Sequence, residues 1–248
     1  MSVDRRTWVV DELAFAGREN LDAGHVARYD GKEDGAAAAE LEALVAAGLS
    51  GDGTVIDMGA GTGQFTLAAA GSVGRVVAVD VSPVMLEHLR VKVRERGLEN
   101  VECVAGGFLT YEHEGEPAEL VYSRLALHHL PDFWKARALV RMADMLKPGG
   151  VLRLSDVVYG FEPAEAEDRL EQWMSALASD DVEGGWTRAE LEEHVRDEHS
   201  TFTWLLEPMI EKAGFTIEQA DYSDDGIFAH YRCVKIASVS GWAMVRRA

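Results

Sequence analysis

The chain of 248 residues has few basic side chains, with 24 Lys and Arg against 43 Asp and Glu and a formal net charge of −19. Proteins that bind nucleic-acid backbones or anionic membranes use patches of Lys and Arg. The sequence contains no run of 5–8 basic residues. We therefore expect neither nucleic acid nor a membrane among its partners.

Cysteine is scarce, because Cys103 and Cys233 are the only two. Two cysteines cannot form the disulfide framework of a small secreted protein or a cluster of thiolate metal ligands. Long apolar runs are also missing: the stretch from Met1 to Val10 is not apolar enough for a signal peptide, and no later stretch could span a bilayer. These absences predict a soluble, cytoplasmic protein.

What the chain does have is an ordinary globular composition, with 47% hydrophobic and 27% charged residues. From residue 54 onward, short β-branched runs alternate with helical stretches. Strands are predicted over 54–58, 75–81, 101–105, 119–123 and 151–155, with helices over 63–70, 82–96 and 131–146. This alternation predicts an α/β fold with a mostly parallel sheet and helices on both faces.

The segments outside this alternation differ in character. Residues 1–50 are predicted to form a helical cap or lid, with a helix over 36–49, and residues 51–156 the ligand-binding core. Helices over 163–178 and 187–199 indicate a helical insertion at 157–202 that caps the substrate. A helix over 203–213 and a hairpin with strands 215–221 and 227–236 complete the sheet within 203–248.

The most informative stretch is the glycine loop, Val55-Ile56-Asp57-Met58-Gly59-Ala60-Gly61-Thr62-Gly63. Glycines at a strand-to-helix turn let a ligand approach the backbone. The dinucleotide pattern needs glycine at position 64, which is Gln, and the Lys of a P-loop is absent. An acid at the strand end would repel a pyrophosphate but attract an ammonium or sulfonium. Asp80 ends the next strand, where a carboxylate can accept hydrogen bonds from ribose hydroxyls.

With these residues in order, the chain resembles the class I S-adenosylmethionine-dependent methyltransferases, of the small-molecule kind similar to the ubiquinone and menaquinone methyltransferases. The resemblance covers about residues 51–156. It is carried by Asp57–Gly63, by Asp80, by the runs Glu119–Leu130 and Leu146–Leu152, and by Arg28-Tyr29-Asp30 upstream. It implies a Rossmann-like sheet of seven strands whose last strand runs antiparallel, and S-adenosylmethionine as cofactor.

The resemblance also assigns cofactor-binding residues. The methionine part would lie over the glycine loop near Asp57, the ribose on Asp80 and the adenine beside Val81, while Tyr29 would cover the cofactor. The full set is Tyr29, Asp57, Gly59, Ala60, Gly61, Gly63, Asp80, Val81, Gly107, Phe108, Ser123 and Arg124. Gly107 stands where the family usually has an Asp that accepts a hydrogen bond from the adenine amino group.

Methyl transfer needs alignment of donor and acceptor, and a base only where the acceptor must lose a proton. His128 and His129 follow the fourth strand at the edge of the crevice and are the candidate catalytic residues. The alternative is that one or both merely close the strand-to-helix junction. Adjacent histidines without an evident acidic third ligand predict no metal site.

The acceptor is expected to bind the parts outside the core, where five of the six tryptophans lie, Trp134 falling within 51–156. Aromatic side chains there favour a small, apolar or aromatic molecule as substrate. Two other functions stay open: a module that binds the cofactor without turnover, and a nicotinamide-dependent oxidoreductase. A homodimer is also compatible with the sequence.

Overall fold

The computed structural model describes residues 7–17, 19–29, 36–179 and 185–236. Eight strands form one sheet, and seven of them follow the order β3-β2-β1-β4-β5-β8-β7. They are β1 (Thr54–Met58), β2 (Arg75–Asp80), β3 (Val101–Ala105), β4 (Ala118–Arg124), β5 (Leu146–Tyr159), β7 (Phe215–Tyr222) and β8 (Phe228–Lys235). The two-residue strand β6 (Thr201–Phe202) pairs with β5 beside this path.

The α/β class and the antiparallel last strand are confirmed. Strands β1 to β5 pair in parallel, whereas β8 runs antiparallel to both β5 and β7. The hairpin between β7 and β8 turns at Ser223–Gly226, where Gly226 N donates to Ser223 O at 2.9 Å. The strand order changes direction at β1, between β2 and β4, which is where open α/β sheets bind ligands.

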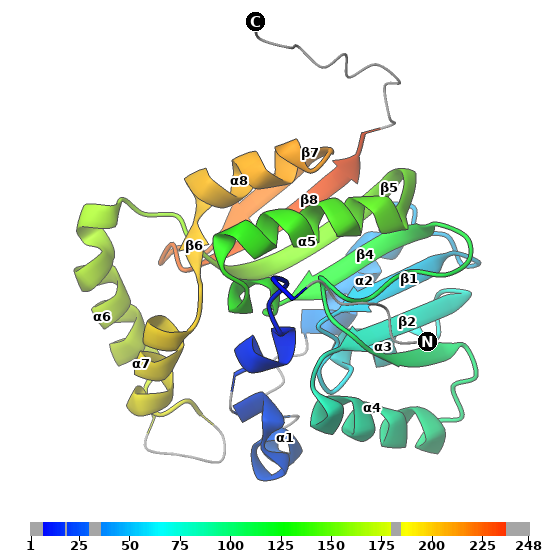
Figure 1. Cartoon of the computed structure of the whole chain (residues 1–248), viewed down its shortest axis with the longest axis horizontal. Helices are drawn as coiled ribbons and strands as arrows, with labels where there is room; N and C mark the ends of the chain where they lie inside the picture. Colours follow the sequence, from blue (N-terminus) through cyan, green and yellow to red (C-terminus); the bar gives the residue numbers. More distant parts are fainter. Residues whose placement is uncertain (1–6, 18, 30–35, 180–184, 237–248) are drawn as a thin grey trace, which may run out of the picture.

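Helices cover both faces of the sheet because alternate side chains of each strand point to opposite faces. Val55 of β1 lies in the apolar cluster under α2 (Ala36–Ala46) and α3 (Gln64–Ala69). Ile56, its neighbour in the chain, lies in the cluster under α5 (Asp132–Met145) and α8 (Thr203–Lys212). The helix α4 (Pro83–Glu95) packs along β2 and β3 (Figure 1).

Short elements surround the carboxyl ends of the strands. Ahead of the core stand η1 (Glu12–Phe15), η2 (Glu19–Leu21) and α1 (Ala23–Tyr29), and η4 (Leu127–His129) joins β4 to α5. Beyond β5, η5 (Pro163–Glu165), α6 (Ala166–Leu177) and α7 (Arg188–Asp197) form a helical unit beside the sheet (Figure 1). This unit has an apolar cluster of its own, in which Trp173, Met174 and Leu191 pack against Tyr159 and Phe161.

The fifth strand is longer than the sequence predicts. β5 begins at Leu146, across the Lys147-Pro148-Gly149-Gly150 turn pattern, and continues past the predicted boundary at residue 156 to Tyr159. Its last residues stay extended because Val157 and Tyr159 are buried in the cluster of the helical unit. Among the described residues, no helix is long and apolar enough to cross a membrane.

Candidate functional site

The glycine loop connects β1 to α3 by three glycines with positive φ, +75° at Gly59, +54° at Gly61 and +90° at Gly63. A Cβ at Gly59 would overlap the side chain of Ala126, and one at Gly63 would overlap Leu89. A Cβ at Gly61 would meet no atom within 4 Å. Gly59 and Gly63 therefore permit close packing, whereas Gly61 borders open space.

Two buried carboxyl groups lie beside this loop. Asp57 is 2% exposed and accepts a hydrogen bond from Thr66 Oγ1 at 2.6 Å. Burial raises the pKa of Asp57 to about 7, although the bond from Thr66 lowers it. Asp80 accepts hydrogen bonds from Gly61 N at 2.8 Å and Ser82 N at 2.7 Å, and burial raises its pKa as well.

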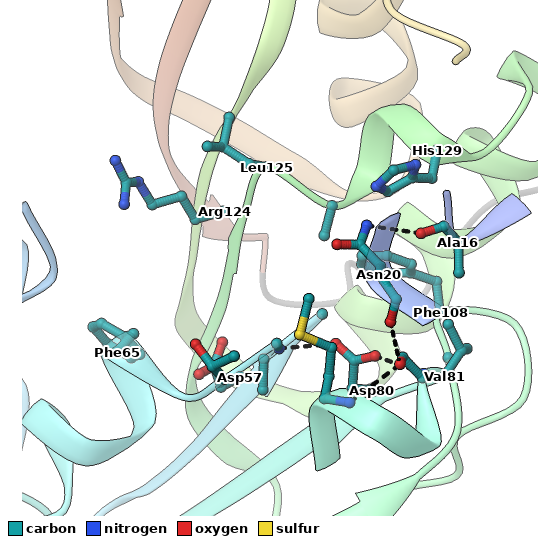
Figure 2. A pocket seen from close by; sticks show the side chains of 18 of the residues that line it. Ala16, Asn20, Asp57, Phe65, Asp80, Val81, Phe108, Arg124, Leu125 and His129 are labelled. Carbon is teal, nitrogen blue, oxygen red and sulfur yellow. Dashed lines mark hydrogen bonds between the residues drawn. The ribbon is translucent and has the colours of Figure 1, made fainter. Parts of the chain in front are cut away.

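A cavity opens at this end of the sheet, with Asp57 and Asp80 on one side and His129 on the other (Figure 2). Ten of the predicted site residues line it: Asp57, Gly59, Ala60, Gly61, Asp80, Val81, Gly107, Phe108, Arg124 and His129. Gly63, Ser123 and His128 do not line it. Tyr29 ends α1, but its side chain lies outside what the structure describes.

Glu12 of η1 also lines the cavity, and sequence reasoning missed it. Its side chain is 5% exposed and accepts hydrogen bonds from Leu109 N at 3.0 Å and Thr110 Oγ1 at 3.1 Å. A Cβ at Gly107 would overlap Oε1 of Glu12 and approach Val81 Cγ1 to 2.6 Å. The carboxylate of Glu12 thus occupies the place beside residue 107 that a side chain there would need.

Leu125, directly after β4, has the single positive φ among the described non-glycine residues, +51°. A branched residue in this conformation costs about 1–2 kcal/mol. Leu125 N donates to Ser155 O at 2.8 Å, and both Leu125 and Ala126 line the cavity. The strained turn brings Ala126 against Gly59 and aims the following η4 at the cavity edge.

His128 lies between two carboxylates. Its Nδ1 contacts Asp156 Oδ1 at very short range, and its Nε2 lies 2.9 Å from Glu198 Oε2. Burial alone lowers its pKa, but Asp156 and Glu198 raise it to about 10. Both ring nitrogens are therefore engaged inside the protein.

His129 differs from His128 in its position, its hydrogen bonding and its pKa. It lines the cavity, its ring lies 4.4 Å from the ring of His128, and its buried Nδ1 has no hydrogen-bond partner. Burial, and next the charge of His128, lower the pKa of His129 to about 4. Of the two predicted catalytic histidines, only His129 offers a neutral ring at the cavity.

The comparisons with known proteins begin with this core. Residues 55–150 match the family model described as a methyltransferase domain. This stretch of the chain is similar to a methyltransferase domain. The resemblance inferred from the glycine loop is confirmed, and the fold is the Rossmann-like fold of that family.

Relatives of the chain include the arsenite methyltransferase of Halobacterium salinarum, 32% identical over 154 residues, with 60% of this chain and 38% of that one covered. The demethylmenaquinone methyltransferase of Lactococcus lactis is 30% identical over 100 residues, with 39% of each chain covered. This chain therefore spans about four tenths of the length of these two relatives. The magnesium protoporphyrin IX methyltransferase of Synechocystis, solved with bound S-adenosylmethionine, superposes with a TM-score of 0.63 at 14% identity, covering 93% of this chain and 100% of that one.

The tryptophans that the structure describes lie outside the lining of the cavity. None of the cavity-lining residues is a tryptophan, within the part of the chain that the structure describes. Trp173 and Trp186 pack within the helical unit, while Trp8 and Trp134 stack on each other at 6.0 Å between ring centroids. The cavity wall near His129 is instead aliphatic, with Leu125, Ala126 and Leu130.

Proposed function

We propose that this protein transfers a methyl group from S-adenosylmethionine to a small, largely apolar molecule. The observation that carries the proposal is a single cavity, in a methyltransferase domain, lined by Asp57, Gly61 and Asp80 together. Open space at Gly61 and two buried carboxylates suit a cofactor that carries an ammonium, a sulfonium and ribose hydroxyls. The cofactor supplies an activated methyl group on sulfur.

The chain's own residues would hold this cofactor from three sides. Asp57 and the loop from Gly59 to Gly61 would hold its methionine part, and Asp80 its ribose. Val81 and Phe108 would flank the adenine. Glu12 would accept the hydrogen bond from the adenine amino group. Its carboxylate lies beside Gly107, the position at which the family usually has an Asp.

The acceptor side of the cavity would begin at His129. The aliphatic wall of Leu125, Ala126 and Leu130 supports an apolar acceptor. His129 is the residue that we expect to touch the acceptor, whereas His128, held by Asp156 and Glu198, orients η4 and is a positioning residue. Cytoplasmic location, a homodimer and the absence of nucleic-acid partners stay predictions.

The decisive experiment incubates the purified protein with a metabolite extract and S-adenosylmethionine that carries a deuterated methyl group. We expect the wild type to produce labelled small molecules. The glycine-loop variant Gly61→Ala should produce none of them. Cofactor binding in calorimetry without any labelled product would favour the non-catalytic module. Binding of NADH in place of S-adenosylmethionine would favour the oxidoreductase.

A further inference from the structure

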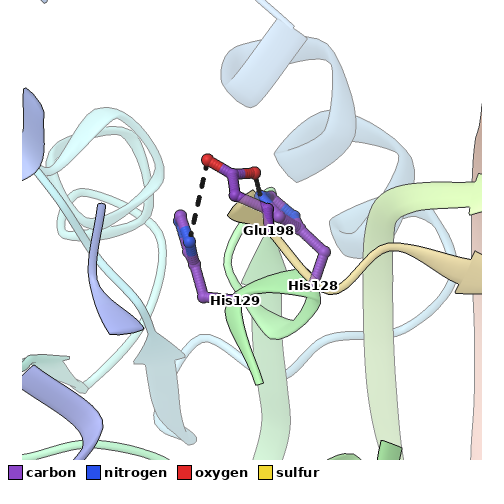
Figure 3. A group of neighbouring side chains, drawn as sticks. All are labelled: His128, His129 and Glu198. Atoms are coloured by element: carbon purple, nitrogen blue, oxygen red, sulfur yellow. Dashed lines mark ion pairs between the residues drawn. The ribbon is translucent and has the colours of Figure 1, made fainter. Parts of the chain in front are cut away.

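We propose that His128, His129 and Glu198 form a binding site for a divalent transition-metal ion at the edge of the cofactor cavity. Each residue offers one donor atom, and these atoms all lie within 4.8 Å of one another (Figure 3). The two histidines come from η4 at the end of β4, and Glu198 follows α7 in the helical unit, so the site joins segments about 70 residues apart.

The histidine next to the carboxylates is already oriented as a metal ligand. Asp156 Oδ1 contacts Nδ1 of His128, and Asp156 Oδ2 accepts a hydrogen bond from the backbone N of His128 at 3.0 Å. These contacts fix the proton on Nδ1 and turn Nε2 toward Glu198, 2.9 Å away. A carboxylate behind a histidine is the arrangement that sets the tautomer and basicity of metal-bound imidazoles.

The second histidine has a buried donor atom without a partner. Nδ1 of His129 makes no hydrogen bond, and it lies 3.9 Å from Glu198 Oε1, too far for one. Buried polar atoms rarely stay unpaired, and each one that does requires an explanation. An ion placed among Nδ1 of His129, Nε2 of His128 and the carboxylate of Glu198 would give Nδ1 of His129 a partner and would replace the proton between Nε2 of His128 and Glu198.

The donor set indicates the class of metal. Two imidazoles and one carboxylate suit zinc, iron, cobalt or nickel, whereas magnesium and calcium prefer oxygen ligands alone. The side chains are shielded from water, with 5%, 16% and 13% of His128, His129 and Glu198 exposed. His194 Nδ1 also contacts Glu198 Oε2 and would hold the carboxylate in place.

The proposed metal site lies beside the cavity. His129 belongs both to the site and to the cavity wall, so a metal there would lie next to the acceptor side. Three protein ligands leave at least one coordination position for water or for an oxygen of a substrate. Orientation of an oxygen-bearing acceptor is the role that rests on the proposed methyl transfer; the metal site itself does not.

The test uses the untagged chain of 248 residues, stripped with a chelator and titrated with Co²⁺, whose visible absorption reports histidine coordination. We expect one equivalent of Co²⁺ to bind, to be displaced by Zn²⁺, and to stay bound through gel filtration. His129→Gln and Glu198→Gln should each weaken binding at least tenfold. Asp156→Asn should weaken it about 10- to 100-fold through the orientation of His128.

The matched control is His88→Gln, which removes a histidine on α4, far from the site in the chain, and should bind Co²⁺ as the wild type does. Calorimetry with S-adenosylhomocysteine on the same preparations shows which variants keep a folded cofactor site. If one variant fails to fold, the other two answer the same question. Absent binding in the wild type, or equal affinity in His129→Gln and His88→Gln, would overturn the proposal and leave a metal-free network of ion pairs. Metal binding without cofactor binding would instead uphold the site and refute the proposed function.

Discussion

At the residue scale, the carboxyl group of Asp57 has a pKa near neutral pH. Burial raises its pKa to about 7, so this carboxyl group is partly protonated at pH 7. Because the folded pKa exceeds the unfolded one, this group stabilises the fold fully below about pH 4 and the contribution is lost as the pH rises through about 7. A cationic ligand beside Asp57 would stabilise its carboxylate form and so lower the pKa of this group.

We therefore predict that cofactor binding releases protons from the protein near pH 6.5. Calorimetry in two buffers with different ionisation enthalpies measures the release as the difference between the apparent binding enthalpies. The Asp57→Asn variant should release fewer protons and show a flatter dependence of affinity on pH between 6 and 8. Identical proton release in the two proteins would contradict the placement of a positive charge beside Asp57.

Glu12 gives a second prediction at this scale, because an acidic group should distinguish bases by the group at C6. Adenine presents an amino donor there, and hypoxanthine presents a carbonyl acceptor. We expect the wild type to bind S-adenosylhomocysteine at least tenfold more tightly than its inosine analogue, since an unpaired buried acceptor costs about 1–3 kcal/mol. In Glu12→Gln the amide can donate to the carbonyl, so the preference should shrink.

A paired substitution checks the same assignment from the other side. Gly107→Asp alone should weaken cofactor binding, because a side chain there overlaps the carboxylate of Glu12. Combining it with Glu12→Ala should recover part of the affinity. If the affinity of the double variant falls by the product of the two single losses or by more, residues 12 and 107 do not act at the same part of the cofactor.

These acidic residues also show where sequence reasoning stops. Asp57 and Asp80 are found from the sequence because Asp57 directly precedes the glycine loop and Asp80 ends the next predicted strand. Glu12 is 95 residues before Gly107, and Glu198 is 70 residues after His128, and nothing in their own neighbourhoods marks them. Only the folded chain brings Glu12 to the cavity and Glu198 to the two histidines, so no local motif could have predicted them.

At the element scale, the glycines of the β1–α3 turn serve two different purposes. Gly63 allows α3 to pack against Leu89 of α4, while Gly61 borders the open cavity. Gly63→Ala should lower the free energy of unfolding by about 2–5 kcal/mol, the sum of left-handed strain and overpacking. Gly61→Ala should cost about 1–2 kcal/mol through strain alone.

The two variants should separate in ligand binding as well. Cofactor affinity should fall at least tenfold in Gly61→Ala and change little in the folded fraction of Gly63→Ala. Urea unfolding and calorimetry measure the two quantities on the same samples. Equal losses of affinity in both variants would mean that Gly63 also borders the ligand.

The elements themselves were predictable where local signals agreed. Strands β1 and β3 match their predicted bounds, and α7 begins at the capping box of Thr187 and Glu190 that the sequence shows. β5 was predicted too short because its first residues contain Pro148 and two glycines, which favour a turn in isolation. Its pairing with β4 and β8 outweighs that preference over the length of the strand.

At the scale of the whole molecule, the cavity is assembled from parts that lie far apart in the sequence. Glu12 and Asn20 reach it from the N-terminal segment, Asp57 and Asp80 from the sheet, and His129 from the junction next to Glu198 of the helical unit. A ligand that contacts several of these parts stabilises the folded protein against unfolding. The excess of acidic residues, with a net charge of −19, further favours a cationic ligand over a dinucleotide.

We therefore predict a large thermal shift with S-adenosylhomocysteine and none with NADH. At a ligand concentration about 100 times the Kd, binding at one site stabilises the fold by about 2.7 kcal/mol. For a domain of this size that corresponds to about 5–11 °C in Tm, at about 2–4 °C per kcal/mol. The shift should shrink in Gly61→Ala at the same ligand concentration. A comparable shift with NADH would assign the cavity to a dinucleotide, and no shift with either ligand would show that the cavity does not take this cofactor.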